Sequence, residues 1–221
     1  VNLSHKRHGV HIKPDLSLLD IPQSIPLKLT KRMTLAQVMK IFDPYGILCP
    51  FTLYGKVYLR ETWARKLGWD DALPDDLRDK WVRFFTLLFD IENNIYPRCL
   101  KPVDTVGNPW LLILSDGSDT AYGFAAYVRW KLKDGSFVCK LIFAKCRIAP
   151  LDKVSTPQME LNAAVLSKRG RKVVESEMRY TFDKVLQIVD SETVLCQINK
   201  LSTRFNLYYG VRLGEIQSAT K

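Results

Sequence analysis

The sequence lacks the features that mark secreted, disulfide-bonded or membrane proteins. Its five cysteines are odd in number and scattered, and no two form a C-x-x-C pair, which argues against a disulfide framework or a zinc knuckle. We therefore expect free thiols in or near a core and a reducing compartment. No apolar stretch approaches the roughly 20 residues that a membrane-spanning helix needs, and there is no signal-peptide pattern. No membrane partner is expected.

Acidic residues are also in deficit, and this deficit points to a polyanionic partner. The 221 residues include 33 Lys and Arg against 23 Asp and Glu, for a net charge of +10. The excess is even, with 16 basic and 11 acidic residues in 1–103 and 17 and 12 in 104–221. Hydrophobic residues make up 47%, which is enough for a core in one large domain or two small ones. A basic globular chain of this kind favours nucleic acid as a partner.

Residues 1–103 are predicted to be mainly helical. The Pro-rich stretch 1–30 offers only two short edge strands, at 10–12 and 25–29. A helix follows over 31–42, where the apolar side chains recur at helical spacing before Asp43-Pro44 stops it. The next helix is expected to bury Leu53, Val57, Trp63, Ala64 and Leu67. The third starts at 71–73 and is expected to bury Leu77, Trp81, Phe84, Phe85 and Leu88.

Residues 104–221 change to a strand-rich pattern. Strands are predicted over 110–114, 121–130 and 137–148, with a hairpin turn at Asp134-Gly135. A helix over 157–179, a strand over 184–189 and a helix capped by Ser191 follow. The order β-β-β-α-β-α describes an antiparallel meander and a crossover helix that leads into a strand parallel to the first.

Three carboxylates lie at the ends of these predicted elements. Asp116 follows the first strand, Glu160 lies in the first turn of the crossover helix, and Asp190 follows the fourth strand. If the first and fourth strands are parallel neighbours, all three acids meet at one edge of the sheet. Each acid alone also has a structural explanation, as a strand end, a helix-start charge or a helix cap. Asp119 is a rival for the role of Asp116.

Such a cluster of acids predicts a divalent-metal site. Carboxylates held together repel one another unless a cation compensates their charge. Oxygen-only ligands select Mg²⁺ or Mn²⁺, and two such ions about 4 Å apart can drive phosphodiester hydrolysis. The small neighbours Gly117, Ser118 and Ser191 are expected to leave room for a phosphate.

Several motifs together carry a family resemblance. They are Ser115-Asp116-Gly117-Ser118, 144–151, 157–164 and Val189-Asp190-Ser191, with 29–32, 42–47, 68–70 and 95–98 upstream. Together they resemble the ribonuclease H module of long-terminal-repeat retrotransposons, in particular the Pao (Bel/Pao) group. The resemblance implies an α/β fold with a mixed, five-stranded-type sheet, apparently truncated, over 104–221. A thumb- or connection-like helical region over 1–103 would precede it.

The resemblance also implies an activity. Asp116, Glu160 and Asp190 would hold two Mg²⁺ or Mn²⁺ ions in an endonuclease that cuts RNA in RNA·DNA hybrids. Its partners would be the hybrid, or another nucleic acid, and the rest of a reverse transcriptase polyprotein. Its location would be a cytoplasmic virus-like particle or the nucleus. Candidate contacts to nucleic acid are Lys145, Arg147, Lys168, Arg169, Arg171 and Lys172. The last four could equally form a solvated helix face.

Three departures from the family pattern leave an alternative open. The chain ends at Lys221, before the helix that normally supplies a fourth acidic ligand, and Glu215 is not in the matching place. Gln158 stands where the family usually has a basic residue. The Asp-Asp pair of a polymerase hairpin is absent, so the chain cannot itself polymerise. The alternative is a catalytically inactive domain, derived from a retroelement, that binds nucleic acid or acts as a scaffold.

Overall fold

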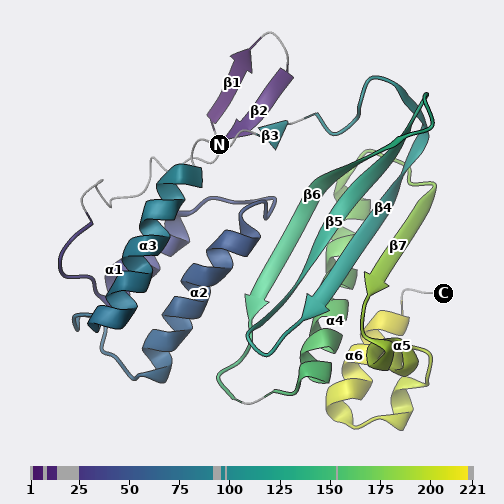
Figure 1. Cartoon of the computed structure of the whole chain (residues 1–221). Coiled ribbons are helices and arrows are strands. Elements are labelled where there is room, and N and C mark those ends of the chain that lie inside the picture. The colour runs from purple at the N-terminus through teal and green to yellow at the C-terminus, as the bar shows by residue number, and fades with distance from the viewer. Residues whose placement is uncertain are drawn as a thin grey trace. The chain divides into compact units, whose positions relative to one another are not determined.

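The computed structural model describes residues 2–6, 9–13, 25–91, 96–97, 99–152 and 154–218. These residues form two compact units, drawn in Figure 1. The first unit comprises residues Val1–Pro44 and Leu48–Cys99, and the second comprises Tyr45–Ile47 and Leu100–Lys221. No helix in the described part of the chain is long and apolar enough to cross a membrane.

Three short strands open the first unit. Strands β1 (Asn2–Lys6), β2 (Gly9–Lys13) and β3 (Tyr96–Pro97) pair antiparallel in the order β1-β2-β3. The strand expected over 10–12 is therefore present, but it lies in the centre of its sheet and not at an edge. The strand expected over 25–29 is wrong, because only an isolated bridge between Thr30 and Ala72 forms there.

Three helices build the core of the first unit. They are α1 (Lys31–Lys40), α2 (Cys49–Ala64) and α3 (Asp75–Ile91). Thr30 caps α1 by accepting a hydrogen bond from the backbone N–H of Met33. The stripe predicted on α3 is confirmed, because each of its side chains is at most 2% exposed. It comprises Leu77, Trp81, Phe84, Phe85 and Leu88.

The buried face of α2 differs from the prediction. Trp63 is 40% exposed, whereas Thr52, Gly55, Leu59 and Thr62 point inward. A Cβ added at Gly55 would lie 3.0 Å from the Phe84 ring. The helix therefore turns its small residues toward the bulky stripe of α3, since only they allow so close an approach.

The second unit is built on a four-stranded mixed sheet. It contains β4 (Thr105–Gly117), β5 (Ala121–Leu132), β6 (Phe137–Ile148) and β7 (Lys184–Val189) in the order β6-β5-β4-β7. β5 is antiparallel to both β4 and β6, and β7 is parallel to β4. The predicted topology is confirmed, as Figure 1 shows.

Local chemistry fixes the β5–β6 hairpin at the predicted turn. Gly135 has φ +85°, a left-handed conformation that a residue with a Cβ rarely adopts. The Asp134 carboxylate accepts hydrogen bonds from the backbone N–H and the hydroxyl of Ser136, at 2.9 and 2.7 Å. The Ser136 hydroxyl, and next its backbone N–H, lower the pKa of Asp134.

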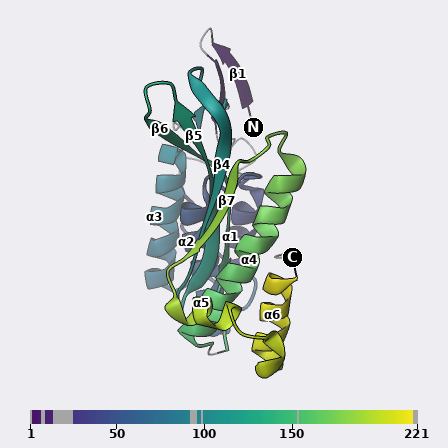
Figure 2. The ribbon, with the colours of Figure 1, turned by 90° about the vertical axis from the view of Figure 1, so that its right-hand side faces the viewer.

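The crossover helix α4 (Thr156–Glu177) covers one face of this sheet, as the edge-on view in Figure 2 shows. The backbone N–H of Ser155 donates to Oε1 of Gln158 at 3.0 Å, so Gln158 serves as a cap of α4. Gly170 allows the helix to lie directly on the Phe124 ring, which an added Cβ would overlap. The shared core also contains Leu111, Ile113, Ala126, Val128 and Trp130.

Two further helices follow β7. α5 (Glu192–Ile198) begins as predicted, with the Ser191 hydroxyl accepting from the backbone N–H of Val194 at 3.3 Å. A 3₁₀ turn (Ser202–Arg204) then leads to α6 (Leu207–Gln217), which was not predicted. α6 buries Leu213 against Leu161 and Ala164 of α4.

The sheet of the second unit has two chemically different faces. Along β4, Leu111 and Ile113 are fully buried beneath α4, whereas Leu114 on the opposite face is 42% exposed. Within the described residues, no helix of this unit covers that opposite face. We call it the open face, and it carries Trp110, Leu112, Leu114 and Asp116 of β4 together with their partners on β5, β6 and β7.

The five cysteines are in thiol form and do not belong to the fully buried core. Cys49 and Cys146 are half-buried, and Cys99, Cys139 and Cys196 are exposed. Two of the exposed thiols, Cys139 and Cys196, lie on surface positions of β6 and α5, where the strand or helix turns them away from its packed side.

Candidate functional site

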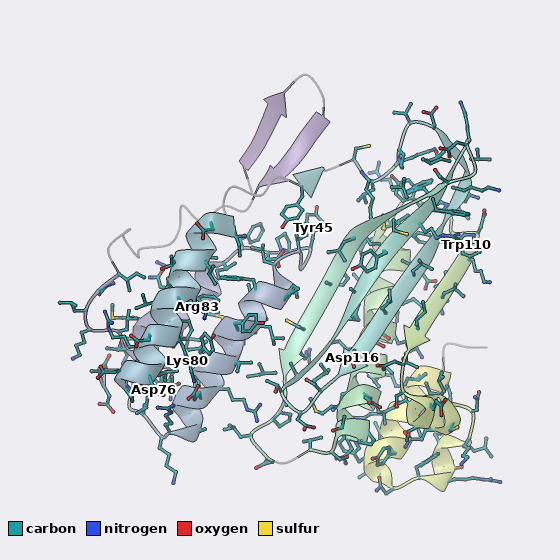
Figure 3. The ribbon with its side chains drawn as sticks, in the orientation of Figure 1. Tyr45, Asp76, Lys80, Arg83, Trp110 and Asp116 are labelled. Carbon is teal, nitrogen blue, oxygen red and sulfur yellow. The ribbon has the colours of Figure 1, made fainter. Side chains whose placement is uncertain are left out.

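Asp116 and Asp190 lie side by side at the carboxyl ends of parallel strands. The last pair of the β4–β7 register is Ser115 with Val189, and the two acids are the next residues along the chain from each. Neighbouring strands are about 4.8 Å apart, so their backbones are close. Both residues are exposed. We call this edge of the sheet, where Figure 3 labels Asp116, the acidic end.

Gly117 brings Glu160 to the same edge. A Cβ added to Gly117 would lie 2.5 Å from the carbonyl carbon of Met159 and 2.6 Å from the backbone nitrogen of Glu160. The start of α4 therefore rests directly on the strand end that carries Asp116. Glu160 is half-buried there.

Other polar residues at the acidic end serve the fold. The Thr156 hydroxyl donates to Oδ1 of Asp119 at 2.6 Å, which ties the turn after β4 to the start of α4. Asp119, the rival of Asp116, is thus engaged in structure. Ser191, and not Asp190, caps α5.

The small residues Gly117, Ser118 and Ser191 were expected to leave room for a phosphate, but each is used in packing, a turn or a helix cap. The space beside Gly117 is filled by the backbone of α4. Ser118 closes the β4–β5 turn by donating to the carbonyl of Ala121 at 3.0 Å, and Ser191 is a helix cap. Their smallness therefore serves close packing and turns at the acidic end.

The three acids share an edge but do not form a finished ligand set. Oδ1 of Asp116 accepts a hydrogen bond from the backbone N–H of Gly117 at 2.6 Å. Among the described residues, no three His, Cys, Asp or Glu side chains are grouped so that they could hold a metal ion. Carboxylates that share a site without a cation repel one another, so spread side chains are expected. The donor chemistry fits Mg²⁺ or Mn²⁺, and metal binding stays a prediction.

Two of the four basic residues in the cluster on α4 bind α6. The Lys168 ammonium donates to the backbone carbonyls of Glu215 and Ile216, and Arg169 makes a bidentate pair with Glu215 at 2.6 and 2.7 Å. Arg171 pairs with Glu175 one turn along α4. The remaining member of the cluster, Lys172, is exposed.

These contacts shift the ionisation of the residues that make them. The hydrogen bond from Arg169 is the main influence that lowers the pKa of Glu215, and burial is the main influence that lowers the pKa of Lys168. Lys168, Arg169 and Arg171 therefore have structural roles in this chain, and nucleic-acid contact by the cluster stays a prediction.

Lys145 and Arg147 lie at the acidic end on β6. Lys145 is opposite Phe124, which in turn is opposite Ser115, so Lys145 lies two strands from the start of the acidic end. Both basic residues are exposed. Neither side chain makes a hydrogen bond or an ion pair among the residues that the structure describes. By register they share the α4 face with Phe124 and Gly117, whereas Asp116 belongs to the open face.

Sequence reasoning missed a second polar group on the open face. Trp110, Arg129 and Phe137 lie on adjacent strands at the end of the sheet opposite Asp116. In Figure 3, Trp110 and Asp116 are labelled toward opposite ends of the sheet. A signal lay in β5, where Tyr127, Arg129 and Lys131 alternate with the apolar Val128 and Trp130, whereas residues 110–114 of β4 are apolar on both faces.

Comparisons with known proteins identify the family of the chain. A family model described as a Pao retrotransposon-like RNaseH-like domain matches residues 30–191, which is more than half of the chain and includes Asp116, Glu160 and Asp190. No curated protein matches. Among solved structures, the NurA nuclease from Sulfolobus solfataricus is 14% identical, with a TM-score of 0.29. That match covers 66% of this chain and 55% of the nuclease, so the chain spans about half of its length. A TM-score this low supports no shared mechanism.

Proposed function

The chain belongs to the Pao retrotransposon-like RNaseH-like family, and from this premise we propose that it is a metal-dependent endonuclease acting on RNA·DNA hybrids. It would act as part of a reverse transcriptase polyprotein. The observation that carries the proposal is that the backbone positions of three acids lie toward one end of the sheet. Asp116 and Asp190 end parallel neighbouring strands, and Gly117 holds the start of α4, with Glu160, against them.

Asp116, Glu160 and Asp190 are the residues that would hold the metal. When bound, a pair of divalent cations supplies an activated water and stabilises the leaving oxygen of a phosphodiester. Lys145 and Arg147 would bind phosphates beside this site, because both are exposed and without an anionic partner among the described residues. An RNA·DNA hybrid would be recognised by its backbone and 2′-hydroxyls.

Cleavage of a labelled hybrid tests the proposal. We expect cutting of the RNA strand in Mg²⁺ or Mn²⁺, and a loss on the order of 100-fold in Asp116→Asn, since one carboxylate ligand is removed. Asp104→Asn is the matched control. Asp104 is exposed at the start of β4 and pairs only with Lys133, at 3.6 Å, so its loss should leave cleavage unchanged. Cleavage that persists in Asp116→Asn would show that another site does the chemistry.

A non-catalytic nucleic-acid-binding domain is the second candidate. The observation that favours it is that no group of three potential ligands is assembled in the described part of the chain. Hybrid binding without cleavage in either metal would establish this alternative. Isothermal titration with Mn²⁺ then separates a site that binds no metal from one that binds metal without turnover.

A further inference from the structure

A row of cationic and aromatic side chains crosses the open face at the end of the sheet opposite Asp116. In register, Trp110 of β4 lies between Lys184 of β7 and Arg129 of β5. Phe137 of β6 lies beside them, opposite Lys131. We call Lys184, Trp110, Arg129 and Phe137 the cation–aromatic row. One side chain from each of the four strands therefore contributes to it.

The rings and charges of the row are in direct contact. The Arg129 guanidinium lies 3.6 Å from the centroid of the Phe137 ring and 4.6 Å from that of Trp110. The Lys184 ammonium lies 5.0 Å from the Trp110 centroid. Cations within about 6 Å of a ring face are attracted to it, so the row is held in place by its own members.

The two cations of the row have no acidic partner among the described residues. Arg32, Arg65 and Arg169 elsewhere in the chain each pair with a carboxylate. Arg129 and Lys184 instead lie against the rings of Trp110 and Phe137. The nearby carboxylates are engaged, since Asp183 accepts from Asn108 at 3.0 Å and Asp104 pairs with Lys133.

This combination fits one class of ligand. A guanidinium stacked between rings keeps its N–H donors directed outward in its own plane, which suits phosphate oxygens. Phe137 is 50% exposed and offers a ring on which a base can stack. Exposed sheet faces that combine aromatic rings with cations are typical platforms for single-stranded nucleic acid.

We propose that the cation–aromatic row binds a single-stranded stretch of nucleic acid that extends from the acidic end. Asp116 lies six positions beyond Trp110 on β4, a span of about 20 Å at roughly 3.3 Å per residue. A strand stacked as in a duplex, at about 3.4 Å per nucleotide, covers this span with about six nucleotides. The binding itself is independent of catalysis, whereas its spacing from a cut rests on the proposed function.

The test measures binding of a fluorescent 12-nucleotide single strand by anisotropy, without divalent cations and over a range of salt. Each phosphate contact on a single strand contributes about 0.7 to the slope of log K against log salt. Lys184→Gln and Arg129→Gln should each lower the slope by about that amount. Phe137→Leu should weaken binding about tenfold through lost stacking.

Lys200→Gln is the matched control, because it removes an exposed lysine remote from the row. Equal slopes in Lys200→Gln, Lys184→Gln and Arg129→Gln would overturn the inference. So would an effect confined to the duplex hybrid. Lys184 is exposed, so its replacement keeps the test valid even if Arg129→Gln melts at a lower temperature.

The outcome separates this inference from the proposed function. Asp116→Asn should retain full single-strand binding while losing cleavage. If the chain never cleaves a hybrid but its variants show the expected salt slopes for single-strand binding, the nuclease proposal is wrong and binding by the cation–aromatic row is supported. If the chain cleaves the hybrid but the salt slopes of the variants are unchanged, the nuclease proposal is supported and binding by the cation–aromatic row is wrong.

Discussion

Gly117 is the residue on which the geometry of the acidic end depends. Its φ is not in the left-handed region, so the requirement for glycine is purely steric. The added Cβ would meet the backbone of Met159 and Glu160 at 2.5–2.6 Å, and a backbone cannot swing aside as a side chain can. The absence of a side chain at Gly117 therefore determines how closely α4 approaches the end of β4.

We predict that Gly117→Ala destabilises the fold by about 1–3 kcal/mol, as overpacking does, and reduces hybrid cleavage by displacing Glu160. Urea unfolding and cleavage rates measure the two effects. Gly214→Ala is the control, because a Cβ there would lie 3.7 Å from the Ser202 hydroxyl, an ordinary contact. A helical Gly-to-Ala change should instead stabilise by up to about 1 kcal/mol. Equal stability of the two variants would contradict the packing argument.

The positions of the acids were predictable at this scale, but the packing role of the neighbouring Gly117 was not. Asp116 and Asp190 follow short apolar runs, and the order of elements suffices to align parallel strand ends. The role of Gly117 depends on how closely α4 approaches, which is a tertiary distance that no local pattern encodes. Gln158, a departure from the family pattern, likewise became explicable only when its bond to Ser155 was visible.

Among the elements, predictability followed the strength of the pattern. α3 buries large side chains at helical spacing, so its face was predicted correctly. α2 offers both an apolar face and a face of small residues, and the shape of its partner decides between them. α6 was missed because Leu207 and Val211 are exposed while only Leu213 is fully buried, and because Gly210 and Gly214 suggest a break.

The attachment of α6 to α4 depends in part on the ionised carboxylate of Glu215. Arg169 lowers the pKa of Glu215 in the folded chain by hydrogen bonding to its charged form. An acid whose pKa is lowered by folding contributes stability above its unfolded pKa, about 4.3, and loses it as pH falls through the folded value. The pair is partly exposed, with side-chain exposures of 56% and 34%, so its contribution is expected to be below about 1 kcal/mol.

A double-mutant cycle measures this effect. We predict that the coupling between Arg169→Gln and Glu215→Gln is favourable at pH 7. It should decline as the pH falls from the unfolded pKa of a glutamate, about 4.3, through the lowered pKa of Glu215 in the folded chain. The coupling free energy is obtained from urea unfolding of the four proteins at several pH values. A coupling free energy that stays the same across the whole acid range would show that packing, and not charge, joins these side chains.

At the scale of the whole molecule, the second unit contains everything needed for its own stability. Both of its cores, one between sheet and α4 and the other between α4, α5 and α6, are made of residues from 100 to 216. Because α4 belongs to both cores, they should unfold together. One contribution comes from earlier in the chain, where the Tyr45 carbonyl accepts from the backbone N–H of Ala144 at 2.8 Å.

We therefore predict that a fragment of residues 100–218 folds alone and unfolds in a single cooperative transition. For the hydrogen bond from Ala144 to Tyr45 that it lacks, it should lose about 0.5–1.5 kcal/mol relative to the same sheet in the whole chain. Gly46→Ala in the full chain is the matched comparison. Gly46 has φ +72° and an added Cβ would overlap the carbonyl of Ala144, so this variant removes the same contact without cutting the chain.

Calorimetry measures the stability of the fragment and of Gly46→Ala, and near-ultraviolet circular dichroism reports whether each retains a packed core. An equal loss of stability in the fragment and in Gly46→Ala would show that, among residues 1–99, the sheet depends only on residues 45–47. A fragment with no cooperative transition would show that the sheet requires more of residues 1–99 than this contact. In that event the acidic end and the cation–aromatic row could be studied only in the whole chain.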